Sequence, residues 1–200
     1  MKKNVILLSK TNKLFNDEAL IDKLKNAPAI PVSQLRYVDI FQPSKSCCGI
    51  YAFFEGDEYH VYDSGNNKQI DCWYIGSATS KAMVDRIGNH FASRYKDFGN
   101  SLLKRIAYAV AKNKQFFNEK NPSLQLVNRM EEIMEKCFLI MQSLKLKIML
   151  YEETKDIVLP DEIRAHEKIL ISHFRPAFNN PKRSKRDLNI CDVSGKRVQY

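Results

Sequence analysis

Runs of apolar residues separated by turn-forming residues predict where the strands of this chain lie. The segments at about 48–55 and 71–76 are rich in aromatic and β-branched residues, which is typical of strands. Two clusters of turn residues surround Tyr59-His60-Val61-Tyr62, which predicts an extra hairpin between these two strands. A further strand is predicted at about 145–152. The pattern therefore predicts about three core strands plus one extra hairpin.

Helical periodicity and capping residues predict the remaining elements. Within residues 1–30, Asn16-Asp17 can cap a short amphipathic helix that Pro28 ends. Further helices are predicted at about 79–95, after caps at Ser101 and Ser123, and at about 160–174. Strands and helices in this order predict an α+β fold.

The excess of positive charge indicates what kind of partner the protein binds. The chain of 200 residues carries a formal net charge of +9 and has a pI near 9.3. An excess of this size favours a polyanionic partner, and nucleic acid is preferred to a membrane because no apolar run approaches the roughly 20 residues of a membrane helix. The apolar run Val5–Leu8 is too short for a secretory signal and predicts an N-terminal strand instead.

Cysteine usage argues against both a disulfide framework and a zinc ribbon. The chain has 5 cysteines, an odd number, and no Cys-x-x-Cys pair. Reduced thiols of this kind are typical of a cytoplasmic protein.

The candidate chemistry lies between Gly49 and His90. Gly49-Ile50-Tyr51 and Tyr74-Ile75-Gly76 fall in the first two predicted strands, so pairing of these strands would bring the two tyrosines together. Arg86 and His90 are four residues apart and would share one face of a helix. Two phenols, a guanidinium and an imidazole around one point would suit a phosphodiester.

This set of residues resembles the GIY-YIG nuclease superfamily. The resemblance rests on the two tripeptides, Arg86-Ile87-x-x-His90, a late helical Glu167 and Pro176-x-x-Asn179. It implies a small antiparallel sheet flanked by helices. The implied organisation is an N-terminal extension at 1–46, a nuclease domain at 47–181 with a helical insertion at about 123–143, and a basic C-terminal tail at 182–200.

Cations in that tail are expected to contact nucleic-acid phosphates. Four of them fall within five positions, namely Lys182, Arg183, Lys185 and Arg186. A basic run can equally be a solvated face, so this assignment rests on the basic character of the whole chain.

Glu167 is the expected metal ligand. It falls within the apolar stripe of its helix, between Ile163 and Leu170, where a carboxylate must be paired or bind a cation. Mg²⁺ prefers one or two carboxylates together with waters and a substrate phosphate, which fits a one-metal site, with Mn²⁺ as an expected substitute. The alternative is a buried Glu167 bridged to an arginine or lysine.

The resemblance assigns catalytic roles to the other residues. Tyr51 would orient the attacking water or take its proton, and Tyr74 would position the nucleophile or the phosphate. Arg86 would stabilise the phosphorane, because a forked and permanently charged donor suits it. Arg105 is a second candidate for that arginine, and the intact Arg86/His90 pairing decides between them.

The remaining assignments are less central. His90 would assist the water or bind phosphate. Asn179 would tether a tyrosine or Glu167, with Asn180 as the fallback. Three other histidines are expected to have packing roles only, namely His60, His166 and His173.

The resemblance implies a Mg²⁺-dependent endonuclease that hydrolyses double-stranded DNA without a covalent enzyme intermediate. A restriction-like or defence nuclease fits a compact enzyme that stands alone, and cutting a palindrome would require a homodimer or successive nicks. The alternatives are a structure-specific repair or recombination nuclease and a module that binds nucleic acid without cutting it. RNA also stays open as a substrate.

Overall fold

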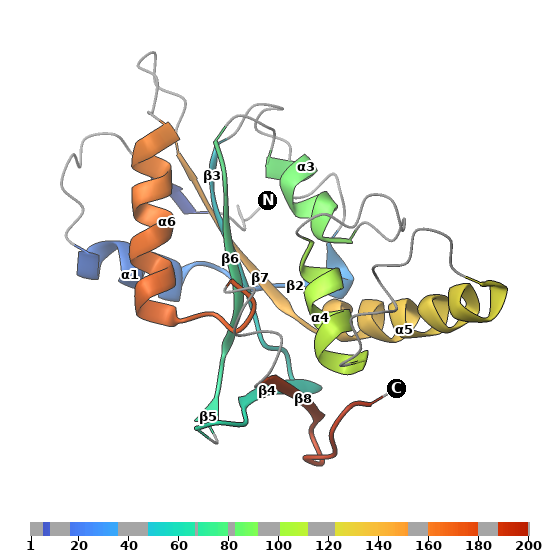
Figure 1. Ribbon diagram of the computed structural model, residues 1–200. Helices are drawn as coiled ribbons and strands as arrows, with labels where there is room; N and C mark the ends of the chain where they lie inside the picture. The colour runs from blue at the N-terminus through green and yellow to red at the C-terminus, as the bar shows by residue number, and fades with distance from the viewer. Residues whose placement is uncertain are drawn as a thin grey trace.

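The fold is α+β, as predicted: a main sheet lies between helices on both of its faces, and a second, small sheet lies at one end (Figure 1). The computed structural model describes residues 6–8 (backbone only), 17–35, 48–66, 68–79, 83–91, 101–111, 123–151, 160–179 and 188–199. Two sets of candidate residues fall outside these ranges, namely Asn180 and the basic group Lys182, Arg183, Lys185 and Arg186.

The main sheet has the strand order β1-β7-β3-β6, and β2 pairs with the end of β7. Its strands are β1 (Ile6–Leu8), β2 (Ile30–Pro31), β3 (Gly49–Phe54), β6 (Cys72–Ala78) and β7 (Lys145–Tyr151). The pairs are antiparallel except for β1, which runs parallel to β7. The three predicted core strands are therefore confirmed, and so is the short strand predicted at the N-terminus.

Side chains along β3 alternate between the two faces of the sheet. Tyr51 and Phe53 belong to the larger apolar cluster on one face, and Ile50 and Ala52 belong to the cluster on the other. All four are buried, since both faces are covered, which explains why the strand is a continuous apolar run. The alternation decides which residues of the neighbouring strand β6 meet which helices.

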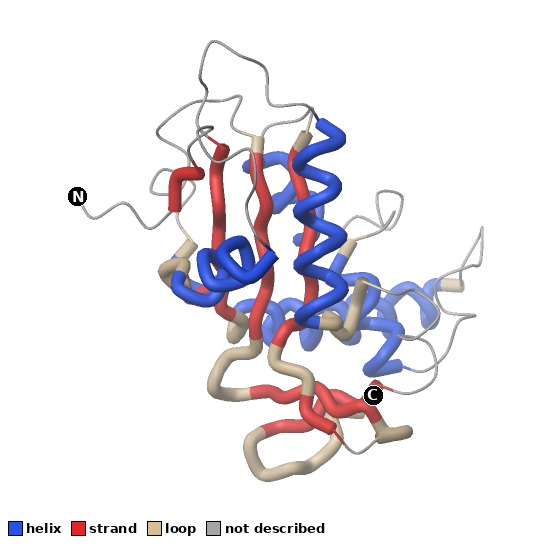
Figure 2. Tube along the Cα trace, turned by 90° about the vertical axis from the view of Figure 1, so that its left-hand side faces the viewer, coloured by secondary structure: helices blue, strands red, loops and turns tan. Residues whose placement is uncertain are grey.

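Helices cover the sheet in two layers (Figure 2). On one face lie α1 (Asp17–Asn26) and α6 (Pro160–Phe174), which pack against each other and against the sheet. On the other face lie α3 (Met83–Gly88), α4 (Leu102–Ala111) and α5 (Leu124–Gln142). Two short 3₁₀ segments complete the order, η1 (Val32–Gln34) and η2 (Asn89–Phe91).

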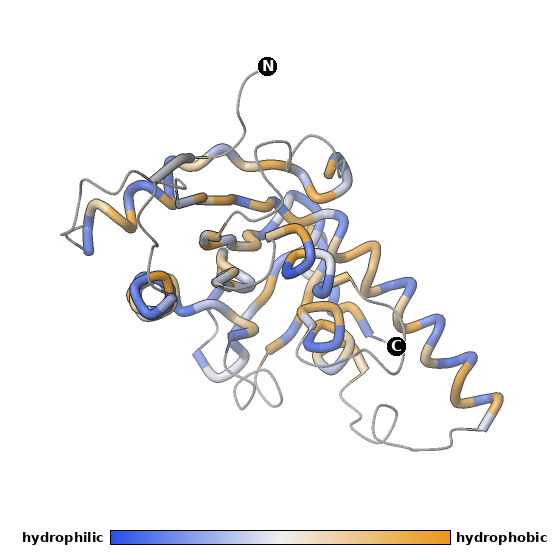
Figure 3. The backbone as a smooth tube through the Cα atoms, turned by 90° about the horizontal axis from the view of Figure 1, so that it is seen from above, coloured by the Kyte–Doolittle hydropathy of each residue, from blue (hydrophilic) through white to orange (hydrophobic). Residues whose placement is uncertain are grey.

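The predicted caps of two helices are confirmed. The hydroxyl of Ser101 accepts a hydrogen bond from the amide of Lys104 at 3.2 Å, and that of Ser123 accepts one from the amide of Leu126 at 3.3 Å. Each bond satisfies an amide that the first helical turn leaves without a partner. Seen from above, α5 alternates between apolar and polar residues along its length (Figure 3).

The predicted extra hairpin is part of a separate sheet with the order β5-β4-β8. Its strands are β4 (Tyr59–Asp63), β5 (Lys68–Gln69) and β8 (Leu188–Asp192). Nothing in the sequence pattern had predicted β8 or its pairing with β4.

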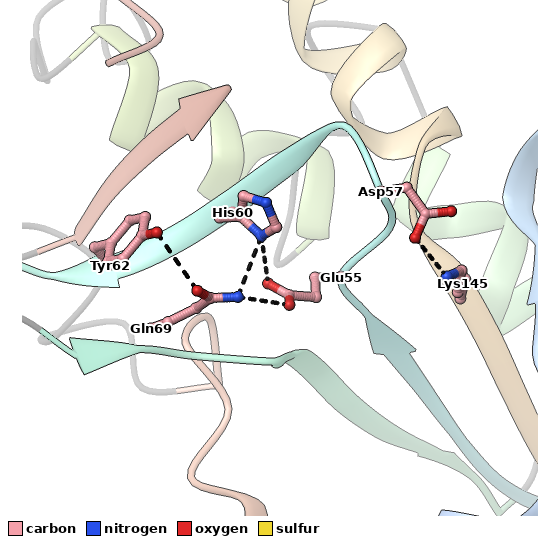
Figure 4. Close-up of polar contacts among 6 residues, drawn as sticks. All are labelled: Glu55, Asp57, His60, Tyr62, Gln69 and Lys145. Atoms are coloured by element: carbon pink, nitrogen blue, oxygen red, sulfur yellow. Dashed lines mark hydrogen bonds and ion pairs between the residues drawn. The ribbon is translucent and has the colours of Figure 1, made fainter. Parts of the chain in front are cut away.

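Polar contacts hold the small sheet to the end of β3 (Figure 4). The Nδ1 atom of His60 lies 3.1 Å from Oε2 of Glu55, and the amide of Gln69 donates to Oε1 of Glu55 at 2.7 Å. Beside them, Lys145 of β7 pairs with Asp57 at 2.9 Å. His60 therefore takes part in a local network rather than in the candidate site.

The described part of residues 1–46 shares the sheet and the apolar core of the rest of the chain. Leu20 and Leu24 of α1 are fully buried and lie in one cluster with Ile163 and Leu170 of α6. Within the described ranges, no helix is long and apolar enough to cross a membrane.

Candidate active site

The side chain of Tyr51 lies against the backbone of Gly76 on the neighbouring strand. The two residues are paired in the register of β3 and β6. A Cβ atom at position 76 would fall 2.5 Å from the hydroxyl oxygen of Tyr51 and 2.9 Å from Cε1 of Tyr74. Glycine is therefore required here for a close approach, and the centroids of the two phenol rings lie 6.4 Å apart. The predicted meeting of the two tyrosines is observed.

His90 holds the hydroxyl group of Tyr51. Its Nε2 atom lies 2.7 Å from the Tyr51 oxygen, and its Nδ1 atom accepts a hydrogen bond from the amide of Leu102 at 3.0 Å. Since Nδ1 is an acceptor, a neutral ring carries its proton on Nε2 and donates it to Tyr51. Burial, assisted by the charges of Arg86 and Arg105, lowers the pKa of His90 to about 3. The ring is therefore neutral at pH 7, and the O–H of Tyr51 is left to donate elsewhere.

Arg105 contacts Tyr74 from α4. Its guanidinium carbon lies 5.5 Å from the centroid of the Tyr74 ring, and its Nη1 donates a hydrogen bond to the carbonyl of Phe178. Arg105 thus joins α4 to the loop after α6. It also covers one side of the phenol cluster, which consists of the rings of Tyr51 and Tyr74. Among the contacts of the described residues, Arg105 is the candidate arginine that lies over a tyrosine ring.

Ser77 joins Glu167 to Arg86. Its hydroxyl donates a 2.6 Å hydrogen bond to Oε2 of Glu167, and its carbonyl accepts one from Nε of Arg86 at 3.4 Å. Alternation along β6 places the Ser77 side chain with that of Ile75, on the face that α6 covers. Arg86 comes from α3 on the opposite face and contacts β6 at a backbone carbonyl. One residue therefore fixes both the acid and the guanidinium.

A cleft of about 500 Å³ opens where these elements meet. It is lined by Ser77, Thr79, Arg86, Arg164, Glu167, Lys168 and Ile171. Three of the lining side chains are cationic and one is acidic, so the cleft favours an anion. Tyr51 does not line it, because that residue is only 1% exposed.

Asn179 clamps the outer edge of β6. Its side chain accepts a hydrogen bond from the amide of Ile75 at 2.8 Å and donates one to the carbonyl of Ile75 at 2.7 Å. Arg175, which follows α6, has a φ of 47°, a left-handed conformation that is typical of a helix end. The expected tether to a tyrosine or to Glu167 is therefore wrong: Asn179 holds the backbone between Tyr74 and Gly76.

Burial dominates the electrostatics of the two phenols. It raises the pKa of Tyr51 well above its ordinary value, and the opposing effects of the Arg86 and Arg105 charges are smaller. Burial also raises the pKa of Tyr74, against the lowering effect of Arg105. Both tyrosines are therefore neutral phenols at pH 7 in the free protein.

The candidate residues form two groups that meet at β6. Tyr51, Tyr74 and His90 lie on the face covered by α3 and α4, whereas Glu167 lies on the face covered by α6. Arg86 connects the two groups through Ser77. The charge of Glu167 acts on both phenols, so the groups are close enough to influence each other.

Sequence reasoning did not single out Ser77, Arg164 or Lys168. A signal for Ser77 was present in the sequence. It is a polar residue two positions after Ile75, so it shares a face with that apolar side chain in a largely apolar strand. A signal for the two cations was their spacing from Glu167, which places all three on one helix face.

Among the described residues, the other two histidines lie outside the candidate site, and the expectation of packing alone is wrong for His166, whose Nδ1 shares a hydrogen bond with the Tyr151 hydroxyl. The ring of His166 stacks on that of Tyr151 with the centroids 5.8 Å apart. His173 contacts the ring of Phe174 with the centroids 4.9 Å apart.

Comparison of the chain with protein-family models, with curated proteins and with solved structures found no match.

Proposed function

We propose that this protein is a Mg²⁺-dependent endonuclease that hydrolyses phosphodiester bonds in double-stranded DNA, of the restriction or defence type. The single observation that carries the proposal is the arrangement around Ser77. Its two polar groups hold the carboxylate of Glu167 and the guanidinium of Arg86 at one cleft. An acid for a metal ion and a fixed cation for a phosphate are the two groups that phosphodiester hydrolysis needs most.

The residues present fit a magnesium ion. The Ser77 hydroxyl donates a hydrogen bond to Oε2 of Glu167, and among the described residues Oε1 accepts no hydrogen bond. No group of three or more acidic, histidine or cysteine side chains that could hold a metal occurs in the described ranges. One carboxylate suits Mg²⁺, which keeps several waters and takes substrate phosphate oxygens as ligands. When bound at Glu167, the ion would supply charge stabilisation for the leaving oxygen.

Arg86 supplies the second positive charge. It is exposed on α3, and its contact with the Ser77 carbonyl uses Nε, so both terminal nitrogens of the guanidinium can bind phosphate oxygens. A bidentate contact of this kind stabilises the charge that grows on the phosphorane, and it also fixes the phosphate in place.

The state of Tyr51 favours orientation of the attacking water over removal of its proton. Burial raises the pKa of this phenol, so it holds its proton at pH 7. The hydrogen bond that Tyr51 receives from His90 fixes the oxygen and leaves the O–H to donate. In this proposal Tyr51 is a neutral donor to a water or a phosphate oxygen.

The wider properties of the chain agree with a nucleic-acid substrate inside the cell. The net charge is +9, and the cleft itself carries more cations than acids. Cys72, Cys137 and Cys191 are thiols rather than disulfides, which agrees with a cytoplasmic location.

One observation favours a second function, namely binding of nucleic acid without cutting. Tyr51 is 1% exposed, so its hydroxyl reaches a substrate only if binding opens the phenol cluster. In a module that only binds, Arg86 would still hold a phosphate, but Glu167 would need no metal.

The test is nicking of supercoiled plasmid in Mg²⁺ and in EDTA by wild type, Arg86→Ala and Glu167→Gln. Gln keeps an oxygen that can accept the Ser77 hydroxyl, so Glu167→Gln removes the charge and leaves the hydrogen bond. We expect nicking by wild type in Mg²⁺ alone, and a loss of at least about a hundredfold in each variant. Arg129→Ala on the surface of α5 is the matched control and should cut like wild type. Equal nicking by all four proteins would refute the proposal.

A further inference from the structure

The face of α6 that borders the cleft carries four residues at helical spacing. Arg164, Glu167, Lys168 and Ile171 follow one another at i, i+3, i+4 and i+7, and all four line the cleft. Ile163 and Leu170 are fully buried against the sheet, on the side of the helix that adjoins Glu167. Along the helix, one cation therefore precedes the candidate metal ligand Glu167 and the other follows it.

Both cations are available to a ligand. Arg164 is exposed, and its ion pair with Asp161 at 3.3 Å joins two exposed side chains, so it is weak and easily exchanged. Lys168 is exposed, and in the part of the chain that the structure describes it has no ion-pair partner. In the described part of the chain neither cation forms an ion pair with Glu167, whose Oε2 accepts a hydrogen bond from Ser77.

We propose that Arg164 and Lys168 form a binding site for the backbone phosphates that flank the phosphate being cut. This inference rests on the proposed function and deepens it, because it gives the DNA strand a path. The strand runs along α6, with Arg86 on the opposite wall of the cleft at the reacting phosphate.

The arrangement suits a chain of phosphates better than a single phosphate ion. The two cations are four residues apart, or about 6 Å along the helix axis, and both belong to the same helix face. A site for one small anion would instead have buried donors that converge on one point. Parallel, exposed cations along an open cleft are typical of contacts that position a nucleic-acid backbone.

The experiment measures binding without cutting. A fluorescent DNA duplex of mixed sequence is titrated in EDTA at a series of NaCl concentrations, with wild type and with the double variant Arg164→Gln/Lys168→Gln. Loss of two phosphate contacts should lower the affinity by about tenfold or more and reduce the slope of log Kd against log[salt] by about two. The conservative variant Arg164→Lys should restore about half of the lost slope when it is combined with Lys168→Gln.

The matched control removes the same charge from another helix. Arg129→Gln/Lys136→Gln lies on α5, on the other side of the sheet, and should keep the wild-type slope. Equal loss in both double variants would show an effect of net charge only and would overturn the inference, as would an unchanged slope in Arg164→Gln/Lys168→Gln. Competition with inorganic phosphate separates the two sources of phosphate. Displacement of the duplex at low millimolar phosphate would also overturn it.

The binding experiment needs no nuclease activity. If wild type binds DNA through these cations but cuts nothing in Mg²⁺, the nuclease proposal fails and the binding site stands. If wild type cuts DNA and the slope is unchanged in Arg164→Gln/Lys168→Gln, only the binding site fails.

Discussion

The Nε2 atom of His90 lies 2.7 Å from the hydroxyl oxygen of Tyr51, and the other ring nitrogen of His90 accepts from a backbone amide. A residue assigned by resemblance to water activation thus has both nitrogens engaged within the protein. Its first role is to fix the phenol and its hydrogen-bond direction.

This buried histidine should make stability depend on pH. Its pKa is about 3 in the folded protein and about 6.5 in the unfolded chain, so the unfolded chain binds the proton first as pH falls. The contribution is fully present above about pH 6.5 and is lost between about 6.5 and 3, by at most ~1.4 kcal/mol per pH unit. Urea unfolding at pH 7 and pH 5 should show a smaller difference for His90→Gln than for wild type. The same difference in both proteins would contradict the neutral buried ring.

If Glu167 binds magnesium as proposed, Ser77→Ala should weaken the affinity for Mg²⁺. Without the hydroxyl, Oε2 of Glu167 loses its 2.6 Å partner and the carboxylate is free to turn. Groups that orient a metal ligand typically contribute about tenfold to a hundredfold in metal affinity. The cleavage rate measured against Mg²⁺ concentration should therefore shift its midpoint upward by that factor. Ser77→Thr keeps a hydroxyl and should stay near wild type, and an unshifted midpoint in Ser77→Ala would remove Ser77 from the site.

Gly76→Ala should displace the phenol cluster. The added Cβ would lie 2.5 Å from the oxygen and 2.6 Å from Cζ of Tyr51, and overpacking of this kind costs about 1–3 kcal/mol. Urea unfolding should report the loss. In a Tyr51→Leu background the phenol is absent, so the same change at Gly76 should cost less than in wild type. Equal penalties in the two backgrounds would show that the clash lies elsewhere.

Arg105→Ala should mainly lower stability, whereas Arg86→Ala should mainly abolish cleavage. Arg105 is half-buried, stacks over Tyr74 and donates to the carbonyl of Phe178, so its loss should lower the free energy of unfolding by about 1–2 kcal/mol. Arg86 is exposed, and its loss should change stability by no more than about 0.5 kcal/mol while abolishing cleavage. Denaturant titrations beside nicking assays separate the two. A stable but inactive Arg105→Ala beside an active Arg86→Ala would make Arg105 the catalytic arginine.

Local pattern was sufficient to predict most elements of the main sheet and its helices. The strands β3 and β6 are largely apolar, β7 carries an apolar run after Lys147, and the helices that begin at Leu102 and Leu124 each follow a serine that caps the helix. Signals of this type are contained in a few neighbouring residues, which is why they can be seen without a structure.

Long-range pairing could not be predicted in the same way. β8 is short, follows a basic segment and pairs with β4, more than a hundred residues earlier in the chain. The contact of Asn179 with Ile75 likewise joins residues 104 positions apart. For the site, the meeting of Tyr51 with Tyr74 could be predicted from strand pairing. The role of Ser77 depends on where α6 lies against β6, which no local pattern contains.

The way β6 is covered has a consequence for how the protein behaves at high concentration. In the described part of the main sheet β6 has one strand neighbour, so its far side would otherwise offer a row of backbone groups to any other extended chain. The amides of Ala177 and Phe178 donate to the carbonyls of Cys72 and Trp73, and Asn179 occupies Ile75. The segment after α6 therefore fills the open edge of β6 and opposes edge-to-edge aggregation. Arg86 binds the next carbonyl along this edge, that of Ser77. The residues that hold β6 in place thus also keep separate molecules from adding to it.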